Sequence, residues 1–397
     1  MPPTPASSSV PHSQRLLLGP GPSMVHPRVL AALARPLVGH LDPVFLELLD
    51  GVQRDLRWLF RTDNALTLPV SATGSAGMEA CFANLVEEGD EVIVGVAGVF
   101  GTRMAEVAER QGADVTRVEV PWGEVIAPEQ IEAALAGCRR PRLVAVVHAE
   151  TSTGAWQPLV DIGRLVRERG ALFTVDAVTS LAGCQLEVDG WGIDACYSAT
   201  QKCLSCPPGL SPVTFGSRAI ARIEARTRKV RSWYLDLGLI GSYFGGDRVY
   251  HHTAPISMIY ALAEALQIVR EEGLEARFER HRLAHLSLLA GLEALGMEPA
   301  AAAGHRLWML NSVTVPAGVE EAVVRRRLLV RHCIEIGPGL GPLAGKVWRI
   351  GLMGESSRPE HVRRLLLALA AELPPDRLPA GAGRKALEAA DAVYQQG

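Results

Sequence analysis

Long apolar runs, abundant cysteine and an excess of charge of one sign are all missing from this chain of 397 residues. No segment approaches the ~20 consecutive apolar residues that a transmembrane helix needs, and the run 16–18 is too short for the apolar centre of a signal peptide. The seven cysteines are few and odd in number, which does not describe a disulfide framework. We therefore expect a cytoplasmic protein that binds no membrane and keeps its thiols reduced.

The charges almost cancel, since 40 Lys and Arg side chains stand against 43 Asp and Glu, for a net charge of −3. Because the arginines are dispersed along the chain, the sequence offers no basic surface for nucleic acid. With 48% apolar and 21% charged residues, the composition is that of a globular protein with a large core. The partners that it favours are small molecules and further copies of the chain.

The glycine motifs that mark nucleotide sites are absent as well. The segment 70–77 follows a predicted strand but matches neither Gly-x-Gly-x-x-Gly nor the ATP-binding loop with Lys, which argues against a nucleotide-binding oxidoreductase on a Rossmann sheet. Cys203 and Cys206 have the spacing of a zinc or redox site, but no second cysteine pair accompanies them. We expect no metal site.

What the chain does contain is a regular alternation of strands and helices. Apolar, β-branched runs predict seven strands, at 66–70, 91–96, 114–120, 143–148, 172–175, 195–198 and 212–215. The helical patterns between most of them end at a glycine, as helices commonly do. This repetition predicts an α/β fold with a mostly parallel seven-stranded sheet, covered by helices on both faces.

The expected boundaries divide the chain into a large α/β domain at residues 15–270 and a smaller α+β domain at 271–378. The second domain begins where the pattern changes to long helices and two further strands. Residues 1–14 are rich in Pro and Ser, which predicts a flexible N-terminal arm. Residues 379–397 turn polar and rich in Gly and Ala, which predicts a peripheral tail.

Two segments after predicted strands offer an anion site and an acid. Ligands of an open α/β sheet bind beyond the carboxyl ends of its strands. Residues 71–77 are small and hydroxylated and run into a predicted helix, whose free N–H groups suit a phosphate, with a plain helix cap as the alternative. Asp176 ends an apolar strand, where a carboxylate is solvated, caps a helix or pairs with a cation in a pocket.

Two further residues add an amine and a guanidinium. Lys202 ends a strand among small polar residues. A lysine at the floor of a cleft loses its proton by burial and attacks a carbonyl, whereas most lysines are merely solvated. Arg349 lies inside an apolar strand and needs a carboxylate or phosphate partner, with a structural ion pair as the alternative. An amine, an acid, an anion site and a guanidinium are together what a pyridoxal-phosphate enzyme needs.

Six segments connect the chain to a known family: Leu-Gly-Pro-Gly-Pro-Ser at 18–23, Glu-Thr-Ser-Thr-Gly at 150–154, Val-Asp at 175–176, Gln-Lys at 201–202, Tyr-His-His-Thr at 250–253 and Arg-Ile-Gly at 349–351. In these segments, over residues 15 to about 375, the chain resembles the alanine–glyoxylate and serine–glyoxylate aminotransferases, in class V of the fold-type I pyridoxal-phosphate enzymes. The resemblance implies the fold-type I architecture and a homodimer whose active sites are shared between two subunits.

The resemblance also implies a role for each site residue. Lys202 forms the aldimine with pyridoxal phosphate, Asp176 pairs with the pyridinium nitrogen, and Arg349 binds the substrate carboxylate. The remaining cofactor contacts come from Thr73, Gly74, Ser75 and Gln201 at the phosphate, Tyr250 and Thr253 of the partner subunit at the same phosphate, Phe100 and Val178 at the ring, and Thr151 at the ring hydroxyl. Phe100 stands where many members of the family have Trp, and it keeps an aromatic face for stacking. Gly21 lies in the segment that shapes a small substrate pocket.

The leading hypothesis is a transaminase that moves an amino group from alanine or serine to glyoxylate or pyruvate through Lys202. Within the same cofactor class, the alternatives are an enzyme like pyridoxamine–pyruvate aminotransferase and a lyase like cysteine desulfurase. Desulfurases usually have His just before the lysine and a reactive Cys on a mobile loop. Here Gln201 precedes the lysine, and Cys333 lies in an apolar stretch that resembles a strand.

Overall fold

The computed structural model describes residues 15–396, and the predicted arm at 1–14 lies outside this range. A seven-stranded sheet forms the centre of the protein. Its spatial order is β2 (Leu66–Val70), β10 (Ser211–Phe215), β9 (Ala195–Tyr197), β8 (Leu172–Asp176), β5 (Pro141–Val147), β3 (Glu91–Val96) and β4 (Asp114–Glu119). β10 runs antiparallel to β2 and β9, and all other neighbours are parallel. The predicted α/β fold with a mostly parallel seven-stranded sheet is confirmed.

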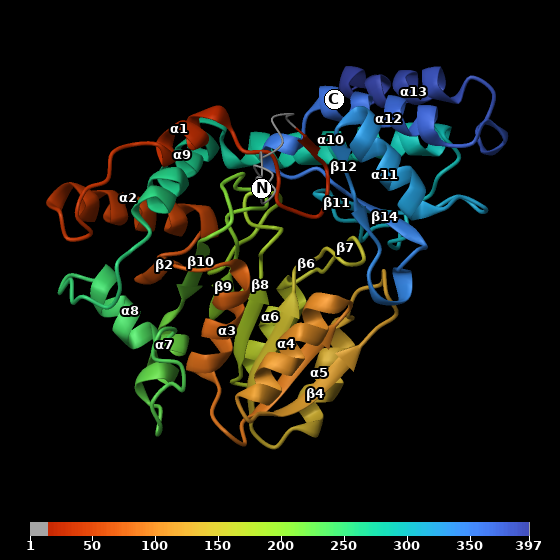
Figure 1. Ribbon diagram of the computed structural model, residues 1–397. Helices are drawn as coiled ribbons and strands as arrows, with labels where there is room; N and C mark the ends of the chain where they lie inside the picture. Colours follow the sequence, from red (N-terminus) through yellow and green to blue (C-terminus); the bar gives the residue numbers. More distant parts are fainter. Residues whose placement is uncertain (1–14, 397) are drawn as a thin grey trace, which may run out of the picture.

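Helices connect these strands and cover the sheet. In chain order they are α3 (Gly74–Leu85), α4 (Val99–Arg110), α5 (Pro128–Gly137), α6 (Val160–Glu168) and α7 (Ser217–Glu224). In Figure 1, α3 and α4 cross in front of the sheet. α4 buries Met104, Ala105 and Ala108, which recur at helical spacing on one face. Because parallel strands are covered on both sides, every residue of β8 is buried.

A further group of helices lies on the side of the sheet where β2 and β10 are found (Figure 1). It comprises α1 (Pro27–Leu33), α2 (Pro43–Phe60), α8 (Leu237–Phe244) and α9 (Ile256–Glu272). A short antiparallel pair, β6 (Ala149–Glu150) and β7 (Ala155–Trp156), follows β5. The turn between these two strands contains part of the site described below.

A second core is built mainly from C-terminal elements. These are α10 (Leu274–Ala294), α11 (Glu321–His332), α12 (Pro359–Glu372) and the antiparallel sheet of β11 (Leu310–Thr314), β14 (Val347–Gly351) and β13 (Gly337–Pro338). β1 (Leu16–Leu17) pairs in parallel with β12 (Ile334–Glu335), and Leu16 and Leu18 are buried in this second core. The start of the predicted large domain thus packs against C-terminal elements. The domain boundary at 270/271 stays a prediction.

Residues after 379 differ from the peripheral tail expected from their composition. They form α13 (Ala382–Gln396), which packs against α10 and α12. Ala382, Ala386 and Ala390 are all buried in the second core. Alanines at four-residue spacing lie on one face of a helix, and their small side chains allow a close approach to a neighbouring helix. Such a stripe is easily mistaken for a polar, low-complexity segment, because the residues that pack are small.

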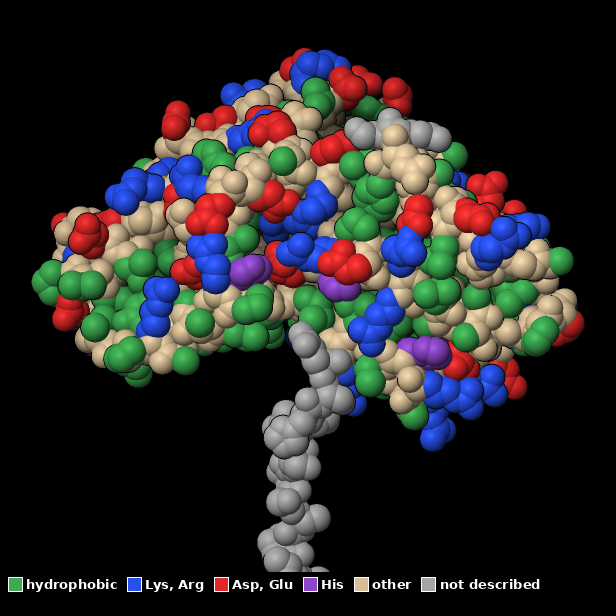
Figure 2. All heavy atoms as spheres, turned by 90° about the horizontal axis from the view of Figure 1, so that it is seen from above, with side chains coloured by type: hydrophobic (Ala, Val, Ile, Leu, Met, Phe, Trp, Pro, Cys, Tyr) green, Lys and Arg blue, Asp and Glu red, His purple; other side chains and the backbone are tan. Residues whose placement is uncertain are grey.

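Side chains of both charges are intermingled on the face of the protein shown in Figure 2. Within the described range 15–396, no helix is long and apolar enough to cross a membrane.

Candidate active site

A cleft opens at the carboxyl ends of the central strands. The structure brings to it residues from five separate parts of the chain that the sequence singles out, namely Thr73, Gly74, Ser75, Phe100, Thr151, Asp176, Val178, Gln201 and Lys202. The cleft is also lined by Met78, Arg103, Val147, Ala149, Thr179 and Tyr197. Its position agrees with the rule that ligands of open α/β sheets bind beyond the strand ends.

Asp176 is the last residue of β8 and provides a buried carboxylate. Its Oδ1 accepts a hydrogen bond of 2.8 Å from the amide of Val178, and its Oδ2 accepts one of 2.8 Å from the hydroxyl of Tyr197. Burial raises the pKa of Asp176 to about 6, although both hydrogen bonds and the charge of Lys202 oppose the rise. A carboxylate held in this way at the floor of a cleft is suited to a cationic partner, which stabilises its ionised form.

Tyr197 is a site residue that the sequence reasoning missed. It lies directly across from Asp176 in the parallel pairing of β8 and β9. Burial and the nearby carboxylate raise its pKa well above the usual value, so the hydroxyl stays protonated and donates to Asp176. Only the strand register reveals this pair, because the two residues are neighbours across the sheet and not along the chain.

Lys202 follows β9 and projects its amine between the sheet and the N-terminal segment. Its Nζ donates a hydrogen bond to the carbonyl of Pro20. Burial lowers the pKa of Lys202 to about 8, so a substantial fraction of the amine is neutral near pH 8. A Cβ placed on Gly21 would lie 2.6 Å from this Nζ, and Gly21 has a positive φ of 109°. The backbone at Gly21 therefore lies directly against the amine, as only glycine allows.

The start of α3 forms one end of the cleft. Thr73 is the residue before the helix, and its hydroxyl makes no capping hydrogen bond, which leaves it and the first N–H groups available to an anion. A Cβ on Gly74 would lie 2.7 Å from the Cβ of Ala199, so the helix start lies close to the loop that carries Lys202. The buried amide oxygen of Gln201 has no hydrogen-bond partner among the described residues. An amide turned by 180° would direct its NH2 group, which donates hydrogen bonds, to this position, and a donor beside a helix N-terminus fits a phosphate group.

Phe100 lies in the first turn of α4 and forms one wall of the cleft, with Val178 on another part of the lining. Glu150 determines where this turn lies. Its carboxylate accepts hydrogen bonds from the amide of Phe100 at 3.1 Å and from the hydroxyl of Ser152 at 2.5 Å. The sequence singles out Thr151 in the motif at 150–154, whereas the positioning role of the buried Glu150 is visible only in the structure.

Arg349 lies on β14, and its side chain is buried. Nε donates to the carbonyl of Pro338 at 2.7 Å, and Nη1 donates to the carbonyl of Thr151 at 3.1 Å. Within residues 15–396, the guanidinium forms no ion pair with Asp or Glu, so the alternative of a structural ion pair does not apply. Burial lowers its pKa, and Glu150 opposes this. A buried guanidinium without a carboxylate partner is suited to an anionic ligand.

Tyr250 and Thr253 are not brought to the cleft of their own chain. They lie between α8 and α9, where the hydroxyls of the two residues are 3.4 Å apart and Tyr250 is exposed. Neither residue is part of the cleft lining. If Tyr250 and Thr253 contact a phosphate, that phosphate has to lie in the cleft of another chain.

Comparison with known proteins identifies the family of the chain. A family model described as aminotransferase class-V matches residues 20–326. Over 399 residues, the chain is 41% identical to the (S)-ureidoglycine–glyoxylate transaminase of Bacillus subtilis, covering 96% of this chain and 95% of that protein. It is 38% identical over 360 residues to the alanine–glyoxylate aminotransferase of Drosophila melanogaster, covering 89% and 91%. The crystal structure of an alanine–glyoxylate aminotransferase from Nostoc sp. has a TM-score of 0.91 at 51% identity, covering 92% of this chain and 97% of that one.

Proposed function

The chain belongs to the class-V aminotransferase family, and from this premise we propose that its cleft binds pyridoxal phosphate and transfers an amino group from alanine or serine to glyoxylate. The observation that carries the choice of a small acceptor is the contact between Gly21 and the amine of Lys202. The family supports this reading over the desulfurase-like lyase and the nucleotide-binding oxidoreductase.

Membership of the family implies the cofactor, and the residues of the cleft fit it. Thr73, the start of α3 and Gln201 would hold the phosphate, while Phe100 and Val178 would enclose the ring. When bound, pyridoxal phosphate carries the amino group and withdraws electrons from the substrate α-carbon. Asp176 is the only carboxylate that lines the described cleft. Its negative charge would lie beside the pyridine nitrogen.

Two further side chains act on the substrate in this proposal. Arg349 would bind the carboxylate that amino donor and oxo acid share, because its fork matches a carboxylate and its own chain leaves it without an acid. Lys202 would move the proton at the α-carbon, because a pKa of about 8 allows its amine both to accept and to return a proton near neutral pH.

The size of the substrate pocket is tested by a donor-by-acceptor matrix of steady-state kinetics. With alanine as donor, we expect glyoxylate to exceed 2-oxoglutarate in kcat/KM by about 10²-fold, because a longer side chain has to displace the backbone at Gly21 from Lys202. Serine and ureidoglycine are included as further donors, because the names of the relatives differ: the Bacillus subtilis protein is named for ureidoglycine and the Drosophila melanogaster protein for alanine. A higher kcat/KM for 2-oxoglutarate contradicts the small pocket.

We further propose that the active form is a homodimer in which Tyr250 and Thr253 reach the phosphate site of the partner. The support is a group of large apolar side chains that are exposed near these residues, where Tyr250 packs against His40 and Trp233 stacks on His251. Trp233 and Tyr250 are 62% and 58% exposed, and Leu37, Val44 and Val249, which are close to His40 or Tyr250 in the sequence, are exposed as well. Apolar surface of this kind is typical of contacts between chains, and an isologous dimer has two equivalent sites.

Mixed dimers test whether the sites are shared. Lys202→Ala and the double variant Tyr250→Phe, Thr253→Ala are each expected to have little activity alone. A heterodimer of the two places both lesions in one site and leaves the other intact, so differentially tagged and co-purified heterodimers should recover part of the wild-type activity. Homodimers of each variant, purified in parallel, are the controls. Heterodimers no more active than these homodimers show that the residues do not act across an interface.

The location in the cell stays a proposal. We propose the cytoplasm, and the support is that all seven cysteines are unpaired in the structure, as expected where thiols are kept reduced.

A further inference from the structure

The main chain around Lys202 is held by groups from outside the large sheet. The amide of Ser23 donates to the carbonyl of Gln201 at 2.9 Å, and the hydroxyl of Ser23 donates to the carbonyl of Lys202 at 2.7 Å. The next carbonyl, of Cys203, accepts a hydrogen bond of 2.5 Å from Nη2 of Arg277 on α10. Three consecutive carbonyls that include the one of Lys202 are thus each fixed by a separate donor.

Arg277 joins this loop to the loop that follows Asp176. Its side chain is 1% exposed, and its Nε donates to the carbonyl of Ala182 at 3.1 Å while Nη2 binds that of Cys203. Ala182 has a positive φ of 64°, which is unfavourable for a residue with a Cβ and needs support from its surroundings. One planar guanidinium therefore sets the distance between the segments after the two central residues of the cleft.

Glu272, at the end of α9, stabilises the buried charge. Its carboxylate accepts hydrogen bonds from Nη1 of Arg277 and, in a two-pronged contact at 2.5 and 3.0 Å, from Nε and Nη2 of Arg280. Although burial opposes it, these hydrogen bonds and the two positive charges lower the pKa of Glu272 to about 2. The carboxylate is therefore ionised throughout the range in which the enzyme works, and Arg277 is not left as an unpaired buried cation.

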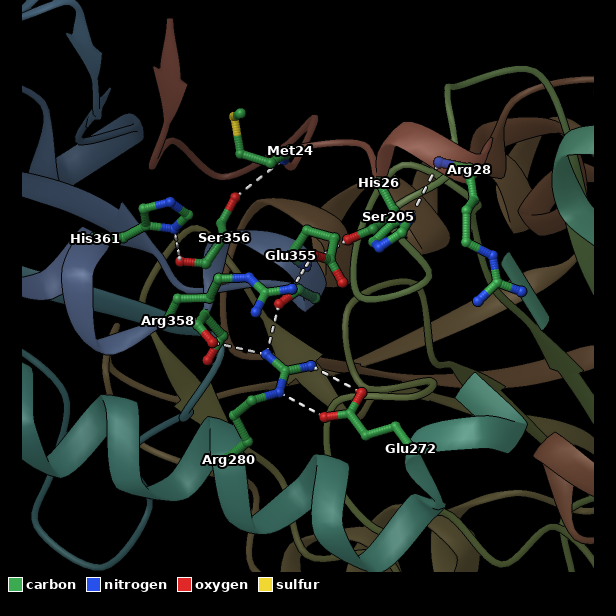
Figure 3. Close-up of polar contacts among 12 residues, drawn as sticks. Met24, His26, Arg28, Ser205, Glu272, Arg280, Glu355, Ser356, Arg358 and His361 are labelled. Atoms are coloured by element: carbon green, nitrogen blue, oxygen red, sulfur yellow. Dashed lines mark hydrogen bonds and ion pairs between the residues drawn. The ribbon is translucent and has the colours of Figure 1, made fainter. Parts of the chain in front are cut away.

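Arg280 uses the same carboxylate but reaches a different part of the protein, as Figure 3 shows. Its Nη1 donates to the carbonyls of Gly354 at 2.8 Å and Ser357 at 2.7 Å. The amide of Glu355 in this turn donates to the hydroxyl of Ser205 at 2.8 Å. Arg280 thus contacts the turn at 354–357 directly, and among the described residues it makes no hydrogen bond of its own to residues 201–203.

We propose that Arg277 is a positioning residue for Lys202, acting through the carbonyls of Cys203 and Ala182 to direct the amine into the cleft relative to Asp176. The inference rests on the proposed role of Lys202 in binding the cofactor. A lysine side chain has four flexible bonds and does not fix the position of Nζ by itself. The main chain from which it extends therefore has to be held in place for the amine to lie at a constant distance from Asp176. A misplacement of about 1 Å at reacting groups costs about 10²-fold in rate.

The test compares Arg277→Lys with the matched control Arg280→Lys. Both substitutions keep a positive charge beside Glu272, and both remove a guanidinium fork. The single nitrogen of an ammonium at 277 cannot occupy the positions of Nε, Nη1 and Nη2, each of which binds a different acceptor. We expect Arg277→Lys to lower kcat by about 10²-fold with KM values near those of the wild type, and to slow the appearance of the visible absorption band when pyridoxal phosphate is added to cofactor-free protein. Arg280→Lys should stay within about threefold in both, while thermal unfolding shows a lower Tm for each variant.

Equal losses in the two variants mean that the cluster only stabilises the fold, and they overturn the proposal. Where Arg277→Lys does not fold, Arg277→Gln replaces it, because it buries no charge and leaves Glu272 paired with Arg280; it should show the same slow attachment and low kcat. Borohydride reduction of the wild-type holoenzyme, followed by peptide mapping, separates the two levels of the inference. Cofactor found on another lysine refutes the proposed function, whereas cofactor on Lys202 with equal variants refutes the positioning role alone.

Discussion

Lys202→Ala is expected to abolish transamination, with a loss of about 10⁴-fold or more in kcat, because one change removes both the covalent attachment and the group that moves the α-proton. The structure supports the choice of this lysine. Its amine lies in the cleft with a pKa lowered to about 8 by burial, whereas Lys229, Lys346 and Lys385, the other lysines of the chain, are exposed. Turnover of alanine with glyoxylate and the visible spectrum after extensive dialysis are the measurements.

Lys385→Ala is the matched control for this substitution, since the side chain is exposed on α13 and lies far in the sequence from Arg349 and from the cleft residues. It should leave both the spectrum and turnover unchanged. In the wild type, attachment of added cofactor should become faster as the pH rises through about 8, because deprotonation of the amine above its pKa supplies the neutral nucleophile. A Lys202→Ala protein that retains the visible band after dialysis shows that another residue binds the cofactor.

Arg349→Lys is expected to lower kcat/KM for both alanine and glyoxylate by about 10²-fold while cofactor content stays near that of the wild type. Nε and Nη1 of Arg349 already bind the carbonyls of Pro338 and Thr151, and the rest of the fork remains for a carboxylate. An ammonium has a single centre, so it cannot keep both carbonyl contacts and also bind a carboxylate through two parallel hydrogen bonds.

Two measurements decide the outcome for Arg349. Steady-state kinetics give KM for donor and acceptor separately, and the absorbance of the bound cofactor per chain gives its content. Arg325→Lys is a suitable control, because Arg325 pairs with Glu321 on α11, whereas Arg349 is hydrogen-bonded to Thr151 of the cleft lining. Unchanged KM values for both substrates remove Arg349 from the substrate site, and a loss of cofactor instead assigns it to cofactor binding.

Agreement between sequence and structure is greatest where the pattern is local. The seven predicted strands all occur in the central sheet. Apolar, β-branched runs and the glycines that end the intervening helices reflect the conformational preferences of residues that are adjacent in the sequence. The same patterns place Asp176 at the end of β8, where parallel strands leave room for a ligand. The sequence predicts that Lys202 ends a strand as well, but it lies in the turn that follows β9, which ends at Tyr197. In contrast, α13 was not predicted from the sequence, because alanines at 386 and 390 give only a weak apolar pattern. Their burial becomes apparent once α10 and α12 are seen to pack beside them.

Local patterns and motifs were enough to predict the class of fold, the strands and the candidate site residues at 73–75, 176, 202 and 349. Which groups hold those residues in place becomes visible only in the folded chain. Tyr197 bonds Asp176 through the register of two strands, and Arg277 connects Ala182 with Cys203 from a helix about 75 to 95 positions further along the chain. The physical reason is that a hydrogen bond depends on the distance between atoms in space, whereas composition, periodicity and spacing describe only neighbours along the chain.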